Sequence, residues 1–150
     1  MSHLFPYGIT LQEGGRVALF PVAEVALRTK EGEYLSLFLV IDSGATISAL
    51  PKNDATLLGI VAEQGIPMMV GGIEGNPIKG WRHTLTIKLG DEEINIPFVI
   101  LDTNEAPRIL GREGIFDRYT VVFEESKRRT GMLTKDTQEA NQVADALDVL

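Results

Sequence analysis

The stretch "LVIDSGATISALP", Leu39 to Pro51, places one aspartate at the end of an apolar run and follows it at once with Ser-Gly-Ala. A carboxylate in apolar surroundings is costly unless it is hydrogen-bonded or paired. Gly44 permits a tight turn that brings backbone N–H groups near the Asp42 carboxylate, and the Ser43 hydroxyl can hydrogen-bond within the same loop. The stretch therefore predicts an oriented, functional carboxylate where a core residue would otherwise stand.

The composition indicates one acidic domain. The 150 residues are 44% hydrophobic, which suits a single core. The net charge of −7 argues against a nucleic-acid partner, because phosphate binding needs a basic face. The absence of cysteine excludes disulfides, thiolate nucleophiles and Cys-based zinc sites. The sequence shows no signal-peptide pattern and no membrane-spanning apolar run, so we expect a cytoplasmic protein with no membrane partner.

The patterning predicts a mainly β domain with many short strands. Residues 22–41 have the pattern of a hairpin whose second strand, an apolar run over 34–41, is expected to be buried on both faces. The amphipathic piece "KNDATLLGI", residues 52–60, predicts one or two helical turns that Gly59 would end. We expect an N-terminal segment over 1–14 that can be mobile, a folded domain over 15–133, and a tail over 134–150 that is either helical or disordered.

Other common chemistries fit the sequence poorly. His3 and His83 are the only histidines, which argues against a Ser-His-Asp triad and against a histidine zinc site. Gly71, Gly72 and Gly75 lack the order of a phosphate-binding glycine loop. We therefore expect no metal and no cofactor, and carboxylate chemistry remains.

Three elements resemble the retropepsin-like aspartic proteases, the single-lobe proteases of retroviral type. "VIDSGATISALP" is similar to their active-site signature, and "RILGREGI", Arg108 to Ile115, is similar to their Gly-Arg element. Between the two, "VGGIEGNPIKGW", Val70 to Trp81, looks like their glycine-rich flap hairpin. Viral members often carry an acidic residue where this chain has Thr46, so the resemblance is closer to cellular and bacterial members.

The resemblance implies a single-lobe acid-protease fold: a closed, barrel-like β structure with an Asp loop, a flap hairpin and a short helix after Gly-Arg. It also implies an aspartic endopeptidase that acts on peptide or protein substrates as a homodimer, because the chemistry needs two carboxylates and this chain has one Asp-Ser-Gly. The alternative is a catalytically weak domain of the same fold, used for dimerisation or peptide binding. The implied site comprises Asp42 as the catalytic residue; Ser43, Gly44 and Ala45 in its loop; Gly71, Gly72, Ile73, Gly75, Asn76 and Ile78 in the flap; Ile47 and Ile109, with Ile73 and Ile78, as pocket walls; and Gly111 and Arg112 as the structural Gly-Arg pair.

Overall fold

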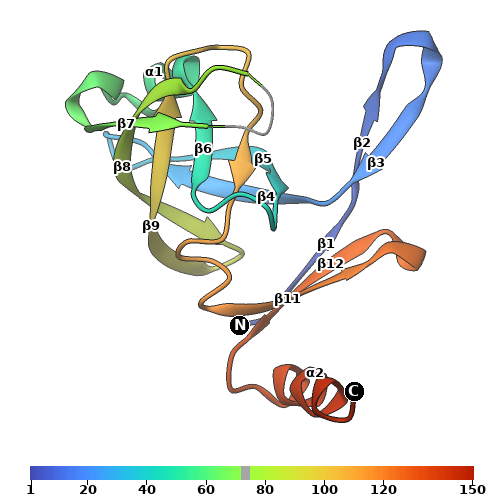
Figure 1. Ribbon diagram of the computed structural model, residues 1–150. Coiled ribbons are helices and arrows are strands. Elements are labelled where there is room, and N and C mark those ends of the chain that lie inside the picture. The colour runs from blue at the N-terminus through green and yellow to red at the C-terminus, as the bar shows by residue number, and fades with distance from the viewer. Residues whose placement is uncertain (72–74) are drawn as a thin grey trace.

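The computed structural model describes residues 1–71 and 75–150, and β-strands around one main core make up most of its regular secondary structure (Figure 1). This confirms the predicted fold class. The largest sheet runs in the order β4 (Val22–Arg28), β5 (Tyr34–Ile41), β10 (Ile109–Leu110), β6 (Ser48–Pro51), β9 (Glu92–Leu101), β8 (Ile78–Leu89) and β7 (Ile66–Val70).

This sheet closes on itself, because β4 also pairs with β8 through Ala26 with Lys88 and Leu27 with Ile87. Closure surrounds a core of aliphatic side chains together with Phe98, Trp81 and Tyr119. A closed sheet has few free edges, which stabilises so short a chain.

The predicted hairpin over residues 22–41 is confirmed as β4 and β5, which pair antiparallel from Val22 with Val40 to Arg28 with Tyr34. Every second residue of β5, ending at Ile41, is buried in the core. The expectation that β5 is buried on both faces is wrong for the single chain, since Phe38 on the other face is 64% exposed. The apolar run therefore has one face that nothing in the chain fully covers.

The predicted short helix after the Asp loop is confirmed as α1 (Lys52–Leu58). Ala55 and Leu58 bury its inner face, and Gly59 ends it in the left-handed conformation at φ 72°. A short 3₁₀ turn, η2 (Ala62–Gln64), leads from α1 to β7.

The short helix expected after Gly111-Arg112 is wrong, because residues 112–118 form consecutive turns. The N–H groups of Ile115 and Phe116 both bond the carbonyl of Arg112, as in a first helical turn. Gly114 then adopts φ +81°, where a right-handed helix cannot continue.

The chain ends form a second, three-stranded sheet, in which the hairpin over residues 120–133 is as the sequence pattern predicts and the added N-terminal strand is not. β1 (His3–Pro6) pairs with β12 (Arg129–Thr134), which pairs with β11 (Tyr119–Glu124) through the turn η3 (Glu125–Lys127). Residues 8–20 then form a separate ribbon, β2 (Gly8–Leu11) and β3 (Val17–Phe20), joined by η1 (Glu13–Gly15). The segment expected to be mobile is thus in strands, and the ribbon projects from the rest of the molecule (Figure 1).

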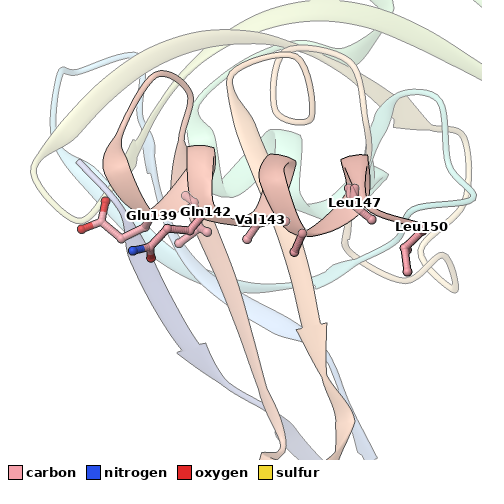
Figure 2. A pocket seen from close by; sticks show the side chains of 7 residues that line it. Glu139, Gln142, Val143, Leu147 and Leu150 are labelled. Atoms are coloured by element: carbon pink, nitrogen blue, oxygen red, sulfur yellow. The ribbon is translucent and has the colours of Figure 1, made fainter.

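Of the two alternatives for the tail, the structure shows the helix α2 (Gln138–Asp148), and the side chain of Thr137 caps it by accepting the Ala140 N–H. Only Ala140 is buried, so α2 leaves a shallow apolar groove against β12, toward which Val143, Leu147 and Leu150 lie (Figure 2). Neither this helix nor any other in the described ranges is long and apolar enough to cross a membrane.

Candidate active site

Asp42 directly follows β5 and is half-buried. Its Oδ1 accepts the Gly44 N–H at 2.9 Å, and its carbonyl accepts the Ala45 N–H at 3.2 Å. Ser43, between them, is exposed. The Asp-Ser-Gly-Ala segment therefore folds around its own carboxylate with the Gly44 N–H bond that the sequence predicts, whereas the Ser43 hydroxyl makes no hydrogen bond to the described residues of the loop.

The two-residue strand β10 passes between β5 and β6 and supports the start of this loop. It runs parallel to β5 and antiparallel to β6. The carbonyl of Arg108 accepts the Val40 N–H at 2.9 Å, and that of Leu110 accepts the Asp42 N–H at 3.0 Å. The backbone of Asp42 is therefore fixed by a strand that follows it by more than sixty residues.

The residues after β10 support the rest of the loop. The Gly111 N–H donates to Ser48 Oγ at 2.9 Å, the Arg112 N–H to the Ala45 carbonyl at 2.9 Å, and the Glu113 N–H to the Thr46 carbonyl at 2.8 Å. Ser48 is fully buried, and sequence reasoning missed it. Ser48 lies inside an apolar run of the sequence, and this position could have indicated its role. A hydroxyl buried there needs a hydrogen-bond partner.

Gly111 is required by this close approach. A Cβ built there would lie 2.6 Å from the carbonyl carbon and oxygen of Ile47 and 2.9 Å from the Ser48 nitrogen. These are backbone atoms, so they cannot rotate away as a flexible side chain could. Arg112 contributes its backbone to the loop, and its side chain is exposed.

An ion pair with one buried partner holds the residue before β10, and no local sequence pattern indicates it. Arg108 donates from Nε to Asp54 Oδ2 at 2.7 Å and from Nη2 to Oδ1 at 2.9 Å. Asp54, on α1, is 1% exposed, and hydrogen bonding to its carboxylate raises the pKa of Arg108. Two-point pairing of this kind fixes both distance and orientation.

The hairpin β7–β8 stands where the sequence predicts the flap. Its strands pair from Ile66 with Arg82 to Val70 with Ile78, so the tip lies between residues 70 and 78. Gly71, Gly75 and Asn76 belong to this tip, whereas the predicted flap residues Gly72 and Ile73 lie outside the described residues. Ile78, at the start of β8, is 41% exposed.

Ile47 and Ile109 come together in a small second cluster, separate from the main core. Its buried members are Ala49, Val99 and Leu101, and Met68 and Val70 of β7 pack against it. We call this cluster the apolar floor. Sequence reasoning named Ile47 and Ile109 but missed the contribution of the hairpin strand.

The carboxylate of Asp42 is thus the acid of this site, held by a backbone amide of its own loop, and Ile47 of the same loop segment belongs to the apolar floor. Within residues 1–71 and 75–150, no three potential metal ligands cluster. One oriented carboxylate beside an apolar surface can bind and act on a neutral, partly apolar substrate, and with a second acid it can take part in proton transfer.

A family model described as aspartyl protease matches residues 32–114, from the turn before β5 through the Asp42 loop and the hairpin to Gly114. The chain belongs to the aspartyl protease family. The match spans more than half of the chain and includes every element of the site described above.

Solved structures show that this member of the family has the retropepsin-like fold, as the resemblance predicts. It is similar to a retropepsin-like aspartic protease from Rickettsia conorii (18% identity, 87% of this chain and 98% of that one, TM-score 0.60). It is also similar to the retroviral protease-like domain of Ddi1 from Leishmania major (15%, 78% and 98%, TM-score 0.52). A third is the EIAV protease in complex with the inhibitor HBY-793 (19%, 69% and 88%, TM-score 0.50). Comparison with the sequences of curated proteins gives no significant match.

Proposed function

We propose that this aspartyl protease is an endopeptidase that works as a homodimer, with one Asp42 from each subunit. The observation that carries the proposal is the fixed Asp42 loop beside the apolar floor. Five hydrogen bonds between residues 108–113 and residues 40–48 hold a carboxylate that a lone chain cannot use for this chemistry. A two-fold axis beside Asp42 supplies the second carboxylate.

The two carboxylates would share one proton, because like charges about 3 Å apart do not both ionise. The ionised carboxylate takes a proton from water as the water oxygen attacks the scissile carbonyl, and the protonated carboxylate gives its proton to the carbonyl oxygen. Collapse of the tetrahedral intermediate breaks the C–N bond as the protonated carboxylate gives its proton to the leaving nitrogen and the ionised one takes a proton from a hydroxyl of the intermediate, which re-forms the C=O bond and restores the shared proton. The pair titrates as a unit, so activity should follow an acid-shifted bell in pH.

The remaining site residues position the substrate in this proposal. Ser43 is exposed beside Asp42 and would hydrogen-bond across the two-fold axis to the partner loop, while Gly44 would present backbone to the substrate. The hairpin tip, with Gly71, Gly72, Ile73, Gly75, Asn76 and Ile78, would close over an extended peptide by main-chain pairing. Ile47 and Ile109, on the apolar floor, would favour apolar side chains next to the cleaved bond.

The test compares Asp42→Asn with a matched variant, Asp91→Asn, whose aspartate is exposed in the turn between β8 and β9. Cleavage of a mixed peptide library is followed between about pH 4 and 7, and light scattering gives the mass of each variant. We expect Asp42→Asn to lose activity by at least about 100-fold, as removal of a general acid or base does. Asp91→Asn should match the wild type.

If the wild type binds peptides without cleaving them, and Asp42→Asn binds them equally well, the endopeptidase proposal fails. The domain would then be the peptide-binding module that forms the alternative.

A further inference from the structure

The ribbon β2–β3, residues 8–20, carries an aliphatic face that the rest of the chain leaves exposed. We call this ribbon the arm. Ile9 pairs with Leu19 and Leu11 with Val17, which places all four side chains on one face. Their exposed fractions are 71% for Ile9, 77% for Leu11, 60% for Val17 and 37% for Leu19.

Such a face needs a partner for two physical reasons. A lone two-stranded ribbon is at best marginally stable in water, and the arm pairs with no third strand in the described part of the chain. Contiguous exposed aliphatic patches on soluble proteins also mark interaction surfaces. The arm lies outside residues 32–114, so it is not part of the region that the family model matches.

The arm adjoins the side of the body that carries Asp42. A cavity of about 700 Å³ lies at its base, lined by Ile9 and Phe20 of the arm and by Phe38 and Val40 of β5. Val40 lies two residues before Asp42 and so on the same face of the sheet. The exposed face of β5, the cavity and Ile9 on the aliphatic face of the arm therefore form one mainly apolar surface, in which Asn104 and Arg108 of the cavity lining are the polar exceptions beside Tyr7. Figure 1 shows the arm projecting from the body.

We propose that the arm packs its aliphatic face onto a second copy of this chain and thereby holds the dimer that completes the active site. The inference rests on the proposed function, which needs a second Asp42. The second copy is the occupant because the apolar surface is continuous with the place where its carboxylate must lie. Two-fold symmetry makes the interface isologous, so each copy gives one arm and receives one.

The distribution of charge also supports a second copy of the chain as the partner of the arm. Two copies at −7 each repel at long range, which disfavours a charged interface. The aliphatic face carries no charge, and the arm's only charged residues, Glu13 and Arg16, lie at its tip and cancel. Two arms also enlarge the contact toward the roughly 800 Å² per partner of a stable interface.

The test uses the double variant Leu11→Ser/Val17→Ser and the matched control Leu147→Ser/Val149→Ser. The control removes two comparably exposed side chains, 61% and 84%, from the end of α2. Sedimentation velocity from about 0.1 to 100 μM gives the dimer dissociation constant. We expect the arm variant to raise it at least tenfold and the control to change it less than twofold. Activity per chain should fall in the arm variant at low concentration and return at high concentration, because Asp42 is untouched.

A second measurement leaves the arm intact apart from one side chain. The chain has no cysteine, so Val17→Cys can be labelled alone with a fluorophore that reports polarity, and Val149→Cys serves as its control. The emission at position 17 should shift blue as concentration rises through the dissociation constant, and the emission at position 149 should not.

The outcomes separate the two proposals. The arm inference is overturned if the arm variant has an unchanged dimer dissociation constant and the emission at position 17 does not shift. If the wild type cleaves peptides in that case, the proposed function still stands. A dimer that weakens in the arm variant although no protein cleaves peptides supports the arm and overturns the endopeptidase. A wild type that stays monomeric throughout the range overturns the arm.

Discussion

Gly111→Ala tests the contact that holds the Asp42 loop. The added methyl would lie 2.6 Å from the carbonyl carbon and oxygen of Ile47, whereas ordinary contact begins near 3.4 Å. The two segments must therefore separate by roughly 0.8 Å, and they are held by hydrogen bonds from Gly111, Arg112 and Glu113. Overpacking of this kind costs about 1–3 kcal/mol, and rigid backbone on both sides puts the cost near the upper end.

A loss of about 3 kcal/mol corresponds to a fall in Tm of roughly 6–12 °C for a chain of this size. The same separation would move the Asp42 loop, and a displacement near 1 Å can lower catalytic rate by about 100-fold. The assays are urea unfolding and thermal melting at one fixed protein concentration, together with kcat/KM on a peptide substrate. A fixed concentration is needed because association would shift the apparent stability.

The matched control is Gly131→Ala on β12. Its methyl would meet only Leu133 Cδ2, at 3.8 Å, which is ordinary contact, so we expect a change within about 0.5 kcal/mol. If Gly111→Ala proves as stable as Gly131→Ala, the close approach of residue 111 to the loop is refuted.

Two further predictions concern groups outside the loop. Arg108→Met leaves the buried Asp54 carboxylate unpaired, and because the Arg108 side chain is 39% exposed we expect a loss of about 2–3 kcal/mol, below the full cost of breaking a buried pair. Urea unfolding measures this loss and compares it with that of Arg28→Met, the control at an exposed arginine, which should lower the free energy of unfolding by less than about 0.5 kcal/mol. Equal losses in the two variants would show that the Arg108–Asp54 pair does not stabilise the fold. Burial lowers the pKa of His3 from its ordinary 6.5, so the unfolded chain binds the proton more readily and stability falls as pH drops below about 6.5. His3→Gln should lose less Tm than the wild type between pH 7 and 5, and parallel losses would contradict a buried, neutral His3.

The sequence predicted correctly those parts of the fold that depend on neighbouring residues. The Asp-Ser-Gly-Ala turn, the β4–β5 hairpin and α1 with its Gly59 end each depend on neighbouring residues, and the structure has all three. Ile47 and Ile109, which are predicted from the sequence as pocket walls, pack against one apolar cluster, and their contact with a substrate stays a prediction.

Long-range contacts explain most of what sequence reasoning missed. Strand β1 exists because it pairs with β12, as in His3 with Met132, and no local pattern in the first residues encodes that partner. The Gly111–Ser48 hydrogen bond joins residues 63 positions apart. The prediction of a helix after Gly111-Arg112 was wrong for a local reason. Gly114 adopts a positive φ, which a right-handed helix does not allow, although the family pattern has a helix there.

The position of β10 in the chain affects how the protein can fold. Residues 108–113 hold the Asp42 loop, yet they are made long after it, so a growing or truncated chain that stops before them has the aspartate but not its support. Bringing residues 108–113 back to the Asp42 loop closes a long stretch of chain, which is slow. Its entropic cost comes before the stabilising contacts form. The acid would thus take up its fixed geometry only once the domain is nearly complete, which would leave unfinished chains without an ordered active-site loop.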